Sequence, residues 1–163
     1  MTDEWKNILV NLYLWILVLG VIGVVFSLTL EFAGYYGGYY GYYYEVSLAS
    51  VFRNPDHLGY LPIFIINGFS FTMFSLISLA GLGVFKIDVS PKLLKWCFYN
   101  SIIIIVVTTT GGIVFEIILA SWGMIDWWLS YGFFAGEIGG FLLMIMIYLV
   151  MKRENITLKV SKD

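Results

Sequence analysis

Charged residues are scarce in this chain. Lysine, arginine, aspartate and glutamate together make up 12% of the 163 residues, whereas hydrophobic residues make up 60%. A soluble domain usually carries about twice that charged fraction, roughly 25%, to cover its surface. The mean hydropathy of +0.87 agrees with this comparison. These figures exclude most water-soluble folds and indicate that much of the surface faces lipid.

Cysteine, histidine and basic charge are scarce as well. The only cysteine, Cys97, cannot form a disulfide within the chain. With only one histidine, His57, the chain alone cannot supply a bis-histidine haem site, and the parts of a Ser-His-Asp or Cys-His centre are in short supply. A net charge of −2 gives no basic patch for nucleic acid. We therefore expect no cofactor, no metal site, no enzymatic activity and no nucleic-acid partner.

Long apolar runs are what the chain has in place of charge. A hydrocarbon core about 30 Å thick requires about 20 helical residues at 1.5 Å per residue. Four runs meet this length, at about residues 8–30, 61–84, 97–120 and 129–150. They lack the alternation of polar and apolar residues that is typical of barrel strands. We therefore interpret them as helices, in which the backbone forms its own hydrogen bonds. The sequence predicts an all-α, integral membrane four-helix bundle, a single polytopic domain over residues 1–163 that has the lipid bilayer as its solvent.

The first run is interpreted as a retained span. Its leader contains Asp3 and Glu4 with a single lysine, and the run exceeds the 7–15 apolar residues of a secretory signal. Eight of the nine basic residues fall in the amino terminus, in the linker between spans two and three, or in the tail at 151–163. The positive-inside rule therefore predicts a multi-pass protein of the cell membrane with both termini in the cytoplasm.

The first outer loop, about residues 31–60, is rich in tyrosine and glycine. Residues 35–44 contain seven tyrosines. Glycine gives a flexible backbone and tyrosine gives rings with one polar tip, which suits either anchoring at lipid headgroups or contact with a partner protein. The spacing in residues 45–52 predicts a short interfacial helix, and Asn54-Pro55-Asp56 predicts a turn. We expect His57 to be a solvated loop residue.

Polar residues inside the spans are costly in lipid and are therefore candidates for function. Counting along each helix places Glu116, Glu137 and Asn67 about 10, 5 and 9 Å outward of the bilayer centre. Glu31 lies at the outer end of the first span, where it can join this group from the outer side. We predict that these four residues face one another as an intramembrane polar cluster. Such a group can serve as a proton or cation site, or as hydrogen-bonded glue between helices.

Gly132, Gly136 and Gly140 follow a GxxxGxxxG pattern in the fourth span. Small residues at this spacing let two helices approach closely, so we expect a helix-packing face there. Without a catalytic constellation, the leading hypothesis is a non-enzymatic membrane subunit or scaffold that assembles as a homo-oligomer or with other membrane proteins. The alternative is a small oligomeric channel or transporter that uses Glu116 and Glu137 for protons or cations.

Overall fold

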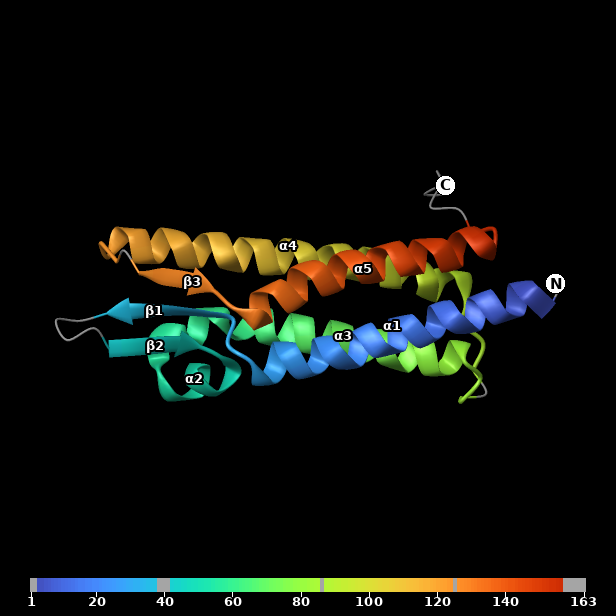
Figure 1. Cartoon of the computed structure of the whole chain (residues 1–163), viewed down its shortest axis with the longest axis horizontal. Coiled ribbons are helices and arrows are strands. Elements are labelled where there is room, and N and C mark those ends of the chain that lie inside the picture. Colours follow the sequence, from blue (N-terminus) through green and yellow to red (C-terminus); the bar gives the residue numbers. More distant parts are fainter. Residues whose placement is uncertain (1–2, 38–41, 86, 125, 157–163) are drawn as a thin grey trace.

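Four long helices form most of the molecule. The computed structural model describes residues 3–37, 42–85, 87–124 and 126–156, and of residues 3–6 only the backbone. The prediction of four helices long and apolar enough to cross a membrane is confirmed, and these helices run along the long axis of the molecule (Figure 1). They are α1 (Asp3–Thr29), α3 (Leu61–Gly81), α4 (Pro91–Ser121) and α5 (Tyr131–Arg153).

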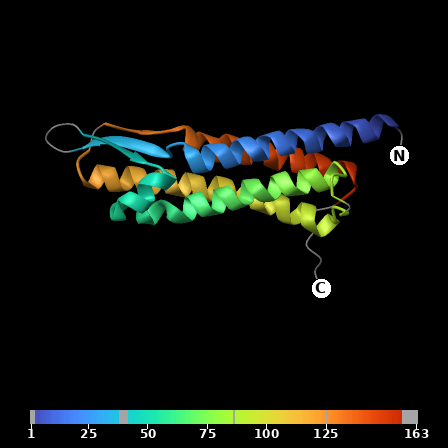
Figure 2. The same cartoon turned by 90° about the horizontal axis from the view of Figure 1, so that it is seen from below.

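Each of the four long helices packs against two of the others. α1 packs against α3 and α5, whereas α4 packs closely against α5 and more loosely against α3. Figure 2 shows α1 and α5 lying on one side and α3 and α4 on the other. The described beginning of α1 and the end of α5 lie at the same end of the bundle, which we call the terminal end (Figure 1). The opposite end, which carries the strands, is called the sheet end.

The beginning of α4 differs from its predicted bound. It begins at Pro91 rather than Cys97. Ser90 explains this start, because its hydroxyl accepts a hydrogen bond from the amide of Leu93 at 3.3 Å and proline is well suited to the first helical position. The two lysines of the first turns are therefore helical, although they lie outside the apolar run. An apolar run locates the part of a helix that suits lipid, whereas capping residues locate its end.

A three-stranded sheet was not predicted for this mostly helical chain. It consists of β1 (Ala33–Gly37), β2 (Tyr42–Val46) and β3 (Trp127–Leu129), in the order β2-β1-β3 with antiparallel pairing. The tyrosine-glycine run contributes to two of its strands, and residues 38–41 of that run lie outside the described residues. Aromatic side chains stack across the strands, with centroids 5.1 Å apart for Tyr35 and Tyr44 and 5.7 Å apart for Tyr43 and Trp128. Such cross-strand pairs stabilise a short sheet.

A short helix and a 3-10 turn connect the sheet to α3. A short helix is present within the predicted segment as α2 (Leu48–Arg53), although Glu45 and Val46 of that segment belong to β2. Ser47 and Ser50 form a reciprocal capping box at its start. At the predicted turn, the Asn54 side chain accepts a hydrogen bond from the Asp56 amide at 3.1 Å and starts the 3-10 helix η1 (Pro55–Tyr60). Contrary to prediction, His57 is only 5% exposed. The turn folds it against the protein, which the loop position did not indicate.

The buried residues form two clusters along the bundle. One lies toward the terminal end and includes Phe71, Phe74 and Leu143. The other lies beneath the sheet and includes Phe32, Phe64 and Phe115. Phe32 contacts the rings of Tyr60, Phe64 and Phe133. The second cluster therefore joins the strands to three of the four long helices and holds the sheet end on the bundle.

Candidate functional site

Asn67 joins α3 to α4 in the interior of the bundle. Its side chain is 2% exposed, and its amide nitrogen donates to the Thr108 hydroxyl at 3.0 Å. The Asn67 carbonyl oxygen has no hydrogen-bond partner among the described residues. An unsatisfied polar atom in such surroundings costs free energy, of the order of 1–3 kcal/mol. The side chain of Asn67 therefore joins the two helices through its amide nitrogen, while the hydrogen-bonding capacity of its carbonyl oxygen is unused.

Glu137 lies on α5 and contacts Thr109, the residue that follows Thr108 on α4. Its carboxyl oxygen is 2.6 Å from the hydroxyl of Thr109, which also reaches the Ile105 carbonyl at 2.9 Å. Since a threonine hydroxyl has one proton, these two acceptors compete for it. The side chain of Glu137 is half-buried at the edge of the contact between α4 and α5. This bond ties α5 to α4 but does not extend to Asn67 among the described hydrogen bonds.

Glu116 occupies a different position. It lies on α4, seven residues beyond Thr109, and its side chain is exposed. Seven residues correspond to about 10 Å along a helix. Within the described part of the chain, its carboxylate makes no hydrogen bond. The structure does not bring Glu116 into contact with Glu137, so whether they act together stays a prediction.

Glu31 connects three segments at the sheet end. Its carboxylate accepts hydrogen bonds from the hydroxyl of Tyr43 and, at 2.6 Å, from that of Ser130. Burial raises the pKa of Glu31, but the hydrogen bonds from Ser130, Tyr43 and Trp128 together outweigh it and lower the pKa below its usual value. The same contact raises the pKa of Tyr43 to about 12, chiefly through its hydrogen bond to Glu31. Glu31 therefore links the end of α1 to the sheet and to the start of α5.

The three glycines of the predicted packing face, Gly132, Gly136 and Gly140, are buried inside the molecule. A methyl group at Gly136 would collide with the side chain of Thr108, and one at Gly140 would lie 2.9 Å from a side-chain carbon of Ile105. At Gly132 the added carbon would lie 2.9 Å from the carbonyl oxygen of Glu31. This stripe therefore faces α4 and the residues after α1 within the same chain. It is not a free surface for a partner helix.

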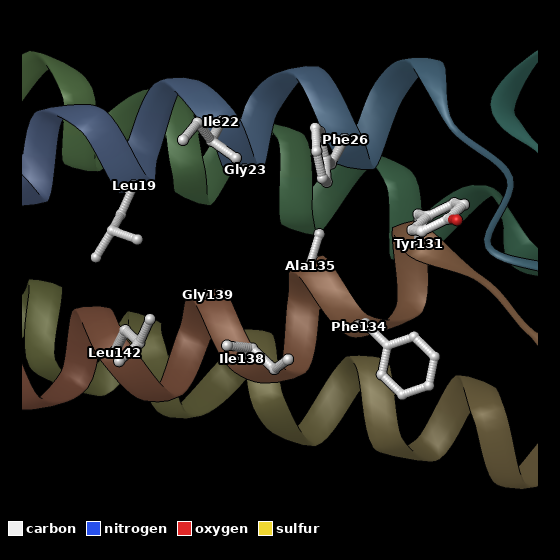
Figure 3. A pocket seen from close by; sticks show the side chains of 10 residues that line it. All are labelled: Leu19, Ile22, Gly23, Phe26, Tyr131, Phe134, Ala135, Ile138, Gly139 and Leu142. Carbon is white, nitrogen blue, oxygen red and sulfur yellow. The ribbon is translucent and has the colours of Figure 1, made fainter.

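A groove between α1 and α5 is exposed instead. It has a volume of about 230 Å³, and its sides come from both helices (Figure 3). Its floor is formed where Gly23 and Gly139 approach the ring of Phe71, which is fully buried. Ala135 projects between the two helices (Figure 3). The lining, which we call the α1–α5 groove, consists of Leu19, Ile22, Gly23, Phe26, Tyr131, Phe134, Ala135, Ile138, Gly139 and Leu142.

A small chamber lies beneath the sheet and contains several polar side chains. Its volume is about 150 Å³. The lining, which we call the sheet-end chamber, consists of Tyr35, Val46, Asp56, His57, Tyr60, Phe115, Ile118, Leu119 and Trp122. These residues come from β1, β2, η1, α4 and the residue that follows α4, and these segments are far apart in the sequence. No local sequence pattern could have indicated their meeting, because a strand and a 3-10 helix that were not predicted supply the polar members.

Within the chamber, His57 differs from the two tyrosines. Both of its ring nitrogens have protein partners, since Nδ1 lies 3.0 Å from the Ser50 hydroxyl and Nε2 lies 3.4 Å from the Asn54 amide nitrogen. Tyr35 and Tyr60 are 8% and 7% exposed. Among the described residues, neither phenolic hydroxyl has a hydrogen-bond partner. The two side chains are buried as a whole, but neither hydroxyl oxygen is among the fully buried atoms that lack a partner, so both hydroxyl groups remain accessible.

A longer groove continues from the chamber between α3 and α4. Its volume is about 360 Å³, and it shares Asp56, Tyr60 and Ile118 with the chamber. The lining, which we call the α3–α4 groove, consists of Asp56, Gly59, Tyr60, Pro62, Ile63, Ile66, Val106, Val107, Thr110, Gly111, Val114 and Ile118. It follows the contact between α3 and α4, which is looser than that between α4 and α5. The two spaces are therefore adjacent, one with polar groups and one almost wholly apolar.

Comparisons with known proteins give no relatives. No protein-family model matches the chain, and neither a curated protein nor a solved structure is significantly similar to it. In the parts of the chain that the structure describes, three or more His, Cys, Asp or Glu side chains nowhere gather in a group that could hold a metal ion. Function must therefore be argued from the residues themselves.

Proposed function

We propose that this chain is a non-enzymatic, four-span membrane subunit or scaffold that assembles with itself or with larger membrane proteins. The four long helices expose many large apolar side chains, including Trp15, Ile65 and Ile117. Exposed surfaces of this kind are stable in lipid and would associate in water. The bilayer is accordingly the proposed solvent for the sides of the bundle.

The proposed orientation places the terminal end in the cytoplasm of the cell and the sheet end outside. Lys92, Lys95, Lys152 and Arg153 belong to helix ends at the terminal end. In contrast, the first loop, which lies at the sheet end, contains a single basic residue, Arg53. This asymmetry follows the positive-inside rule. The aromatic residues of β3 and of the connection before it agree with an outer interfacial belt.

The observation that carries the proposal of assembly is the α1–α5 groove. Helices associate in lipid mainly through close packing at small residues, because lipid tails are as apolar as the helices. Gly23, Ala135 and Gly139 line the groove, whereas the glycine stripe of α5 is occupied within the chain. The groove therefore offers the small residues at which a side chain of a neighbouring helix can pack.

This proposal is tested by the mass of the protein purified in a mild detergent. We expect an assembly heavier than the 18.6 kDa chain, and we expect Ala135→Leu to reduce it by filling the α1–α5 groove. Ala120→Leu is the matched control, because it makes the same change at an exposed position of α4. A wild-type protein that is monomeric and binds no other subunit, or an unchanged mass for Ala135→Leu, would contradict the proposal.

The second candidate function is a small proton or cation transporter. It is favoured by one observation, the bond of 2.6 Å between Glu137 and Thr109 in the contact between α4 and α5. A carboxylate among helices is costly in lipid unless it has a partner or a purpose. Glu116 is assigned to the same pathway in this alternative, although it is exposed on α4. The two functions differ in whether the purified protein alone moves ions.

A further inference from the structure

We propose that the sheet-end chamber and the α3–α4 groove together bind a neutral amphiphile, with an oxygen-bearing head in the chamber and a single apolar tail in the groove. The two spaces adjoin at Tyr60 and Ile118. This inference does not depend on whether the chain assembles with partners. It concerns a different face of the bundle from the α1–α5 groove, since that groove lies between other helices.

The two tyrosine hydroxyls indicate what the head of the ligand must offer. Tyr35 and Tyr60 are more than nine-tenths buried and line the chamber. Neither hydroxyl has a partner in the described parts of the chain, so each can donate to a bound oxygen. Burial, followed by the charges of Tyr44 and Asp56, raises the pKa of Tyr35, so its hydroxyl keeps its proton at neutral pH. A carbonyl, ester or hydroxyl oxygen satisfies such donors.

The fixed surroundings of the tyrosines make this a formed site. The ring of Phe115 contacts both, with centroids 6.2 Å from Tyr35 and 6.0 Å from Tyr60. Tyr35 also stacks on Tyr44. His57 does not compete for the ligand, because both of its nitrogens have protein partners. The two donors are therefore held by aromatic packing and remain available.

Charge at the junction excludes an anionic head. Asp56 lines both spaces, and no lysine or arginine lines either. A phosphate or fatty carboxylate would be repelled by this aspartate and would find no cation. The groove itself is apolar apart from Asp56, Tyr60 and Thr110. Its volume of about 360 Å³ lies within the range typical of small-molecule sites. Neutral single-tailed lipids fit these requirements.

The experiment compares three probes with the same kind of tail but different heads. Monoolein has a neutral ester head, oleate has an anionic head, and 1-octadecene has none. Binding is measured by native mass spectrometry of the full-length protein released from a mild detergent. We expect one monoolein per chain, bound in preference to both other probes. Equal binding of 1-octadecene and monoolein would overturn the assignment of the chamber.

Two kinds of variant test the two spaces separately. We expect the double variant Tyr35→Phe and Tyr60→Phe to weaken monoolein binding about ten-fold, because it removes both donors and keeps both rings. We expect Gly59→Leu to abolish binding by filling the groove. An added Cβ at Gly59 has no atom within 4 Å, so the new side chain starts from open space at the edge of the groove.

The matched control is Tyr131→Phe, which removes a phenolic hydroxyl from the α1–α5 groove. Its binding of monoolein is expected to equal that of the wild type. Unchanged binding in either the double tyrosine variant or Gly59→Leu refutes the proposed site. Thermal midpoints of all variants in detergent identify any loss that comes from unfolding, and Gly59→Leu decides the question if the tyrosine variant is unstable.

Discussion

At the scale of single residues, Glu31 has the densest hydrogen bonding of the four polar residues chosen from the sequence. Its carboxylate accepts bonds from Ser130 and Tyr43, and Trp128 contributes a third. Each donor belongs to a different segment, namely the start of α5, β2 and β3. The sequence indicated that Glu31 lay at the outer end of the first span, but its donors are distant in sequence and could not be identified. Their meeting depends on the sheet.

Acidification is expected to weaken this contact. The pKa of folded Glu31 lies below that of the unfolded chain, so its contribution to stability is present above the unfolded pKa, near 4.5, and is lost as the pH falls through the folded value. We expect the thermal midpoint of the wild type to fall between about pH 6 and pH 3 more steeply than that of Glu31→Gln.

The control for the Glu31 prediction is Glu116→Gln, since Glu116 has no side-chain hydrogen bond in the described residues. Its midpoint is expected to follow the wild-type pH dependence. Thermal melts followed by near-ultraviolet circular dichroism report on the aromatic residues of the sheet end. Parallel pH curves for the wild type and Glu31→Gln would show that the carboxylate does not stabilise this region.

At the scale of elements, the helices were predictable and the sheet was not. A run of about 20 apolar residues is long enough to identify a span by itself. Strands of five and three residues have no such signal, and the glycine-rich run between residues 35 and 44 suggested flexibility. The described parts of this run, residues 35–37 and 42–44, pair with each other, and β1 also pairs with β3, about 90 residues away in the chain. The chamber beneath the sheet was missed for the same reason.

The contact between α4 and α5 is expected to be sensitive to one methyl group. At Gly136 an added carbon would collide with Thr108, which also accepts the hydrogen bond from Asn67. Alanine favours a helix over glycine by about 1 kcal/mol, whereas overpacking usually costs about 1–3 kcal/mol. Because the collision is with a buried side chain on a packed helix, overpacking is expected to dominate, and Gly136→Ala should lower the thermal midpoint.

Gly59→Ala is the control for this prediction, because its added carbon meets no atom within 4 Å. Both proteins are compared by thermal unfolding in the same detergent. If Gly136→Ala is as stable as the wild type, α4 and α5 can separate slightly without loss. In that case the glycines of α5 are not required for the close approach of α4 and α5.

At the scale of the whole molecule, the positions of aspartate and glutamate along the helices help to distinguish a transporter from a subunit or scaffold. Residues 7–18, 71–81, 91–105 and 142–153, which lie in the terminal halves of the four long helices, contain no aspartate or glutamate, and Asp3 and Glu4 come only at the very start of α1. A proton or cation path across the bundle would therefore lack carboxylates over half its length. This distribution favours the subunit or scaffold over the transporter.

We accordingly expect liposomes that contain the purified protein to show no more proton or sodium flux than protein-free liposomes. The measurement uses a pH-sensitive dye and a sodium-sensitive dye inside the vesicles. Flux that disappears in Glu137→Gln but persists in Glu45→Gln, a change in the sheet, would replace the first function by the second. A comparable leak in all three proteins would indicate damage to the vesicles rather than a path through the bundle.

The position of β3 sets an order for the maturation of the protein. β1 pairs on one side with β2, which follows it closely, and on the other side with β3, which precedes α5. During synthesis the β1–β2 hairpin emerges long before residues 127–129 exist. One edge of β1 therefore remains open until residues 127–129 have been made, and pairing across such a separation is slow. The sheet is therefore complete only once the segment that leads into α5 is present. A chain truncated before residue 127 keeps an unpaired edge on β1.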